Sequence, residues 1–246
     1  MDQEHAVRQA LARSHLYCLL SPLFLYPEEE TLSGLNWVEG EEAVALLRNP
    51  DGLKEAFESL RGCLKNSADL QSEFVRIFGH TLGEDCSPYE TQYGGAHIFQ
   101  QAQDLGDIAG FYRAWGLEVS DQAKERLDHI SIELEFTGFL THKEAYALAS
   151  GEKERAEICR EAQRKFLNDH LGRWVAVFTK RLEEAAKAGF YHRLALLLER
   201  FLAFEVKALG VQPVKVQALT QFAPEPEGLC ERCQTNDECF PEEGSS

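Results

Sequence analysis

Four ionisable side chains stand close together between residues 125 and 133, and their spacing suggests chemistry. Asp128 and His129 are adjacent, and Glu125 and Glu133 stand four residues before and after His129. Residues four apart are neighbours on a helix, so this spacing predicts an imidazole between two carboxylates on one flank. Nearby negative charge favours the protonated ring, and we expect His129 to be cationic at neutral pH. A solvated ion pair on a helix surface would give the same pattern.

A second cluster of reactive side chains lies near the C-terminus. Cys230, Cys233 and Cys239 fall within ten residues. Two thiolates in a Cys-x2-Cys pair suit one zinc ion or one corner of an iron–sulfur cluster. A closed structural site takes four ligands, so Cys86, a histidine or a second protomer would have to supply the fourth. The alternative is a flexible tail that carries free thiols and no cofactor.

Other catalytic patterns are absent from the sequence. No histidine follows a glutamate by three residues, as the carboxylate-bridged two-metal bundles require, and no two histidines are four apart. The chain also lacks the glycine-rich nucleotide loops and the GxSxG nucleophile motif. The sequence therefore favours a binding protein over an enzyme.

The charge of the chain is strongly acidic. Its 246 residues include 25 Lys and Arg against 41 Asp and Glu, a formal net charge of −16. Residues 224–246 carry −6 of this charge, which leaves −10 on the rest. Nucleic acids and anionic membrane surfaces attract basic proteins, so neither is expected as a partner. A basic partner is expected instead.

Several features predict a cytoplasmic protein. Acids occupy the first residues, MDQEHAVRQA, where an export signal would be positively charged. The longest apolar run, residues 16–26, is interrupted by Ser21 and Pro22 and is too short to span a bilayer. Seven cysteines, four of them scattered singly, do not form a disulfide framework. We therefore expect a reduced compartment and no membrane insertion.

The elements that position these residues follow from apolar residues at helical spacing and from glycine stops. The expected helices cover residues 2–20, 41–47, 51–64, 67–78, 97–115, 120–150, 152–170, 171–187 and 190–209. Ser120 is the expected N-cap of the longest helix. No window shows the period of two that strands require. The sequence predicts one all-α domain over residues 1–210, followed by an acidic Pro- and Cys-containing extension over 211–246.

The longest break in the helical pattern is the loop 79–96. It contains four glycines, Pro88, Tyr89 and Tyr93. Tyrosines in so polar a loop indicate a surface that contacts a partner. The alternative is that both rings simply hold the loop against the body.

Three blocks of sequence resemble the TorD/DmsD/NarJ family of cytosolic chaperones for molybdenum enzymes. They are EFVRIFGHTLGEDCSPYETQY at 73–93, ERLDHISIELEF at 125–136, and the closing helices from FLNDH at 166 to FLAFE at 205. The resemblance runs from the first helix to about residue 209. Thr91 departs from the family, which often carries Ser there, and many members lack the cysteine tail.

The resemblance implies an all-α bundle of the TorD/DmsD type that works without catalytic turnover. Such chaperones bind the apo form of a molybdopterin-dependent oxidoreductase, often through its twin-arginine signal peptide, and assist cofactor insertion and assembly before export. A monomer and a homodimer both remain open. So do two alternatives, a zinc or iron–sulfur accessory or redox protein that uses the tail cysteines, and a structural subunit that stays in a mature complex.

The resemblance also assigns roles to residues of this chain. Asp128 and neighbouring acids are expected to meet the arginines of the signal peptide. His129 belongs to the motif, but a cationic ring would repel arginine, so a structural or switching role is expected for it. The acids expected to help Asp128 are Glu90, Glu125 and Glu133, and the residues expected to line the apolar side are Phe78, Pro88 and Tyr89.

Overall fold

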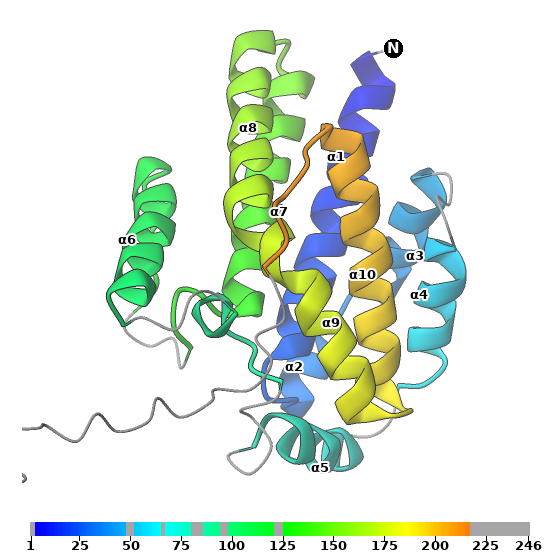
Figure 1. The fold of residues 1–246 in the computed structure, drawn as a ribbon. Helices are drawn as coiled ribbons and strands as arrows, with labels where there is room; N and C mark the ends of the chain where they lie inside the picture. Colours follow the sequence, from blue (N-terminus) through cyan, green and yellow to red (C-terminus); the bar gives the residue numbers. More distant parts are fainter. Residues whose placement is uncertain are drawn as a thin grey trace, which may run out of the picture.

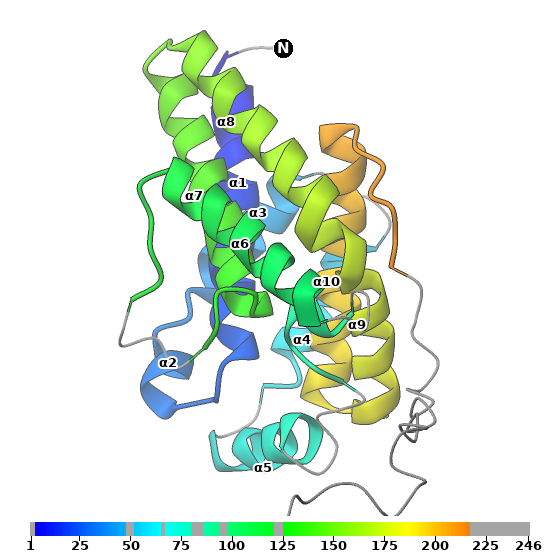
Figure 2. The ribbon, with the colours of Figure 1, turned by 60° about the vertical axis from the view of Figure 1, so that its left-hand side comes forward.

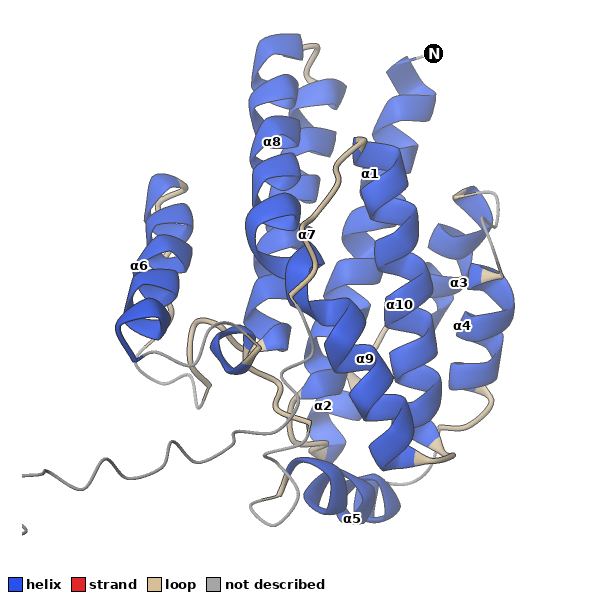
Figure 3. Cartoon of the chain, viewed as in Figure 1, coloured by secondary structure: helices blue, strands red, loops and turns tan. Residues whose placement is uncertain are grey.

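The structure is a computed structural model that describes residues 3–47, 52–64, 67–79, 86–93, 98–120 and 125–216. The described residues form helices and no strand, which confirms the predicted all-α class (Figures 1 and 3). The helical elements are α1 (Gln3–Leu20), η1 (Ser21–Phe24), α2 (Glu29–Ser33), α3 (Trp37–Leu46), α4 (Leu53–Arg61), α5 (Ser67–Phe78), η2 (Glu90–Gln92), α6 (Ile98–Ala114), α7 (Ile130–Ala149), α8 (Lys153–Phe166), the π-helical segment η3 (Leu167–Leu171), α9 (Gly172–Ala186) and α10 (Phe190–Leu209). No helix in the described ranges is long and apolar enough to cross a bilayer.

The bundle is built around α1 and α7, which pack along each other. Gly138 makes this close packing feasible, because a Cβ there would lie 2.9 Å from Cβ of Tyr17. Helix α8 covers α7, while α9 and α10 pack together beside α1 (Figure 1). Helices α3 and α4 close one side, α5 lies across one end, and α6 stands to one side of the bundle (Figures 1 and 2).

Most predicted helix boundaries are confirmed to within a few residues, and α5 and α10 have the predicted ends. The predicted start of the longest helix is wrong, because α7 begins at Ile130 and not near Ser120. His129 is its N-cap, and the His129 side chain accepts a hydrogen bond from the backbone N–H of Ser131. Residues 125–129 instead form a turn that pairs with a distant loop. Residues 121–124 lie outside the described ranges.

A buried ionic network holds four helices of the bundle together. The Arg13 guanidinium of α1 donates two hydrogen bonds of 2.7 Å to the Glu205 carboxylate of α10. It also donates to Glu144 of α7 at 3.1 Å and to Gln163 of α8 at 2.6 Å. Tyr17 adds a 3.0 Å bond to Glu205. Each of these side chains is almost fully buried.

This network was not anticipated from the sequence, and its charges depend on one another. Burial alone would lower the pKa of Arg13, but Glu205 and Glu144 outweigh that effect and raise the pKa, so the guanidinium stays protonated. A buried ion pair adds little net stability compared with apolar residues, yet removing one partner leaves an uncompensated charge. Arg13 is therefore the residue on which the arrangement of α1, α7, α8 and α10 depends.

We predict that Arg13→Met lowers the free energy of unfolding by about 3–5 kcal/mol, because Glu205 and Glu144 lose their buried counter-charge. Urea unfolding followed by circular dichroism measures the change. Arg155→Met is the matched control, since Arg155 is 73% exposed in its pair with Glu152. Its effect should stay below about 1 kcal/mol. Equal losses in the two variants would contradict the proposed importance of the buried network.

Candidate functional site

The loop with Tyr89 is fixed to the turn that contains Asp128 and His129. The backbone N–H of Glu90 donates to the Asp128 carbonyl at 2.9 Å, and the N–H of Ile130 donates to the Pro88 carbonyl at 2.9 Å. Between these bonds, Tyr89 and His129 form an isolated antiparallel bridge. Two of the three blocks of sequence that carry the family resemblance therefore form one structural unit at the N-terminal end of α7.

Asp128 is fully buried and its carboxylate is occupied within the chain. Arg126 donates to it with both Nε and Nη2, at 3.0 and 2.7 Å, and the Thr91 hydroxyl donates at 2.8 Å. The Asp128 side chain has no exposed surface, whereas half of the Arg126 side chain is exposed. Thr91 supplies the hydroxyl donor that Ser would also offer. Asp128 therefore shapes this turn and does not present a free carboxylate to a partner.

Three accessible groups of this unit lie together: the Tyr89 ring, Glu125 and Arg126, which we call the Tyr89 corner. The guanidinium of Arg126 lies 4.6 Å from the centre of the Tyr89 ring. The Tyr89 hydroxyl donates to Glu125 at 2.5 Å. Burial and this bond raise the pKa of Tyr89, so the phenol stays protonated. Glu125 remains 25% exposed, and within the described ranges its second oxygen accepts no hydrogen bond.

The prediction that His129 is a cation is wrong. Burial lowers the pKa of His129 to about 4, although Glu125 and Asp128 oppose the shift. Because Nδ1 accepts from Ser131, the single ring proton is assigned to Nε2. Nε2 lies 3.9 Å from Glu125, too far for a hydrogen bond, and the neutral ring makes no ion pair there. His129 is a buried helix cap stacked edge-on against Tyr89.

Glu133 does not flank His129 on a surface, as the helical spacing predicted, but points into the core. The indole N–H of Trp174 donates to it at 3.1 Å. Burial and the negative charge of Glu90 raise the pKa of Glu133 well above its usual range, so this acid is protonated at neutral pH. Glu90 is also buried, with both oxygens 3.2 Å from Nδ1 of His170. Neither acid is accessible to a partner in this arrangement.

His170 reaches Glu90 from the π-helical segment between α8 and α9, where the sequence predicted two ordinary helices. Gly172 ends that segment, and a Cβ there would lie 2.3 Å from the Leu167 carbonyl oxygen. On its other side His170 faces Asp107 of α6 at 3.4 Å. The site residues that sequence reasoning missed are Thr91, Arg126, His170 and Trp174. Only Arg126 had a local signal, a cation two residues from Asp128.

Phe78 lies in a different cluster from the other predicted residues. Its ring packs against Phe74 of the same helix and Tyr191 of α10, with ring centres 4.9 and 5.5 Å apart. Within the described residues no ring contact joins this cluster to Tyr89. The structure therefore brings Glu90, Glu125, Glu133, Asp128 and His129 together with the loop, and leaves Phe78 apart.

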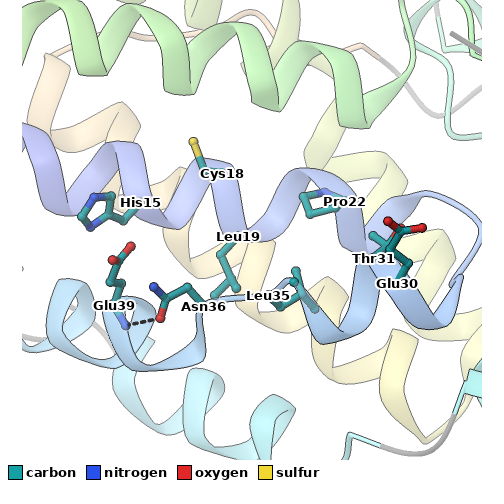
Figure 4. Close-up of a pocket in the computed structure, with 10 residues that line it drawn as sticks. His15, Cys18, Leu19, Pro22, Glu30, Thr31, Leu35, Asn36 and Glu39 are labelled. Carbon is teal, nitrogen blue, oxygen red and sulfur yellow. Dashed lines mark hydrogen bonds between the residues drawn. The ribbon is translucent and has the colours of Figure 1, made fainter. Parts of the chain in front are cut away.

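Surface hollows lie beside both α1 and α7. The first, of about 500 Å³, lies between α1 and the α2–α3 turn, with Leu19 and Leu35 in its lining and Glu30 and Glu39 towards opposite ends (Figure 4). The second, of about 320 Å³, is an apolar groove between one face of α7 and the residues that follow α6. Ile132, Phe136 and Phe139 of α7 form one wall of this second hollow, which we call the α7 groove.

The predicted metal ligands are not tested by the structure. Cys230, Cys233 and Cys239 lie outside the described ranges, and Cys86, considered as a fourth ligand, is buried in the core. Within the described ranges, no three His, Cys, Asp or Glu side chains come together in a way that could hold a metal ion. A metal site in the tail stays a prediction.

The chain is therefore an all-α helical protein in which a Pro-Tyr loop is fixed to an Asp-His turn. Residues 48–180, which contain both parts of this unit, match the family described as nitrate reductase delta subunit. The chain is 30% identical over 207 residues to the perchlorate reductase assembly chaperone protein of Dechloromonas aromatica, covering 80% of this chain and 89% of the relative. It is 27% identical over 200 residues to the chaperone protein TorD of Vibrio parahaemolyticus, covering 77% and 90%. This chain belongs to the TorD/DmsD/NarJ family of chaperones for molybdenum enzymes.

We predict that His129 makes the fold less stable in acid. The unfolded chain binds a proton on this residue near pH 6.5 and the folded chain near pH 4, so stability falls as pH falls through that window. The shift corresponds to about 3 kcal/mol. As pH falls from 7 to 4, the free energy of unfolding of His129→Gln should therefore rise by about this much relative to that of wild type, as measured by chemical unfolding. The exposed His142→Gln is the control, and a similar gain there would contradict the assignment.

Glu133 should have the opposite pH dependence. Its folded pKa is raised, so above about pH 4.5 the unfolded chain releases a proton that the folded chain keeps, and stability falls as pH rises. Glu133→Gln keeps a neutral group that can accept a hydrogen bond from Trp174. The free energy of unfolding of this variant, relative to that of wild type, should therefore rise from pH 5 to pH 8. Glu135→Gln, at an exposed position of α7, is the control. A constant difference across this range would argue against a protonated Glu133.

Proposed function

We propose that this protein is a chaperone for the cofactor-free catalytic subunit of a molybdopterin-dependent oxidoreductase. It binds the subunit through a basic twin-arginine leader and holds it until cofactor insertion and assembly are complete. The observation that carries the proposal is the Tyr89 corner, where a fixed loop and turn leave an aromatic ring and the Glu125 carboxylate open to a partner. The relatives named as assembly chaperones support it. The encounter precedes export and therefore takes place in the cytoplasm.

The charges of the corner suit an arginine-bearing leader. Outside residues 224–246 the chain carries a net charge of −10, which attracts a basic segment over a distance. Glu125 is the accessible carboxylate, and a guanidinium donating to its second oxygen would form a charge-assisted hydrogen bond. Tyr89 offers a ring face for a second guanidinium or for an apolar side chain.

Asp128 contributes to this function by positioning other groups. It holds Arg126 over the Tyr89 ring and ties Thr91 of the loop to the turn. A leader arginine could also replace Arg126 on Asp128, but the buried carboxylate is reached only after Arg126 moves away. The proposal is that Arg126 stays in place and that the leader meets Glu125.

The test is calorimetric titration with the twin-arginine leaders of the molybdenum oxidoreductases of the same organism. Glu125→Gln should weaken binding about tenfold, the value of one charge-assisted bond, and should reduce the salt dependence. It should not change thermal stability. Asp128→Asn should weaken binding and also lower the melting temperature, because it loosens the corner.

Two further variants complete this test. Glu42→Gln removes an exposed acid of α3 and should leave the affinity unchanged. Arg126→Ala should weaken binding if Arg126 positions Tyr89, whereas tighter binding would show that a leader arginine takes its place on Asp128. No binding of any of these leaders by the wild-type protein would overturn the proposed function.

A further inference from the structure

We propose that the α7 groove receives the apolar segment that follows the arginines of the client leader. This inference rests on the proposed function and assigns a place to the second half of the same ligand. The groove is formed where α6 stands to one side of the bundle and the chain returns towards α7 through residues 117–120 (Figure 2). Phe136 and Tyr112 are each 4% exposed and form the buried base of the groove, while Ile132 and Phe139 are only partly buried. An apolar segment placed there would cover these side chains.

The wall opposite α7 offers backbone groups as well as side chains. Leu117, Glu118 and Val119 follow the end of α6 without regular structure and line the groove. Within the described ranges, the backbone groups of Glu118 and Val119 make no hydrogen bond. An extended peptide can pair with such a segment as a strand would, and the groove then selects apolar side chains.

The charges along the groove give the ligand a direction. Among the residues that the structure describes, Glu118 and Glu135 line it and no Lys or Arg does. Lys143 lies just beyond, 5.6 Å from the centre of the Phe139 ring, so the far end is basic. Lys143 would repel arginines at that end, whereas Glu125 of the Tyr89 corner would attract them at the N-terminal end of α7. A segment that starts basic and becomes apolar fits this order when it runs from the N-terminal end of α7 towards Phe139.

Tyr112 connects the groove to the Tyr89 corner. Its ring lines the groove and packs against Phe136, while its hydroxyl donates to the Leu127 carbonyl at 2.9 Å, next to Asp128. From the rise per residue of an α-helix, the wall from Ile132 to Phe139 is about 10 Å long. That length fits about three residues of an extended peptide. The groove therefore takes the start of the apolar segment and leaves its remainder outside.

Two other surfaces suit this ligand less well. The larger hollow in Figure 4 contains no aromatic side chain among its lining residues, and several of those residues are polar. The patch on α5 contains Phe78, which the sequence placed in the site, but the rings of Phe74 and Phe78 already pack against Tyr191. On that patch Val75 is the strongly exposed apolar side chain, at 57%.

The first experiment maps the contact directly. The leader that binds in the titration is synthesised with a benzophenone side chain at the second residue of its apolar segment and is photo-crosslinked to the full-length protein. Peptide mass mapping should find the adduct in residues 112–120 or 132–139. An adduct in α5 would overturn the assignment to the α7 groove.

The second experiment measures affinity and separates the two proposals. Phe139→Ser should weaken binding of the leader about tenfold, because the complex then buries less apolar surface. The same substitution should not affect a leader whose apolar segment is replaced by Gly and Ser. Val75→Ser is the matched control and should bind like wild type. Melting curves confirm that both variants are folded.

The outcomes of the second experiment have distinct meanings. If wild type binds and Phe139→Ser binds equally well, the α7 groove is not the site and the proposed function stands. If Val75→Ser loses affinity and Phe139→Ser does not, the apolar segment lies on α5. If wild type does not bind the leader, the proposed function fails together with this inference.

Discussion

The arrangement of this bundle depends on one guanidinium that is buried among acids. Apolar burial drives the helices together but does not fix how far one slides along another. Arg13 does fix it, because its donors must point at carboxylates on α10 and α7 and at an amide on α8. With α7 held in this way, its N-terminal end has a defined place from which to present the loop and the turn.

A second set of buried polar groups operates at that end of α7. Asp128 with Arg126 and Thr91 ties the loop to the turn, and Glu90 with His170 and Glu133 ties both to the core. Most of the acids that the sequence suggested as binding residues therefore serve to hold the loop and the turn in place. Within the described residues, what they present to a partner is the Tyr89 ring, the exposed part of Arg126 and the accessible carboxylate of Glu125.

This division suits the proposed function of holding a client and later releasing it. A rigid corner loses little conformational freedom when it binds, and its few exposed charges act mainly on the rate and direction of the encounter. The apolar groove beside the corner would add contact area without a deep pocket. Such a surface permits moderate affinity and exchange, which a chaperone needs when its client leaves for assembly.

The sequence by itself determined the helical class, most helix boundaries and the two blocks that form the corner. Helix formation follows from local spacing of apolar residues, so α10 could be predicted from Phe190 to Leu209 without knowledge of its neighbours. Only the tertiary structure decided the state of the charges. Spacing placed Glu125 and Glu133 beside a cationic His129. In the structure a turn fixed by the distant loop precedes the helix, which begins only at Ile130. Burial then makes His129 neutral and keeps the proton on Glu133. The pKa values of Arg13 and Glu133 depend on solvent access and on acids from distant segments, Glu205 beside Arg13 and Glu90 beside Glu133, and local spacing carries no information about either.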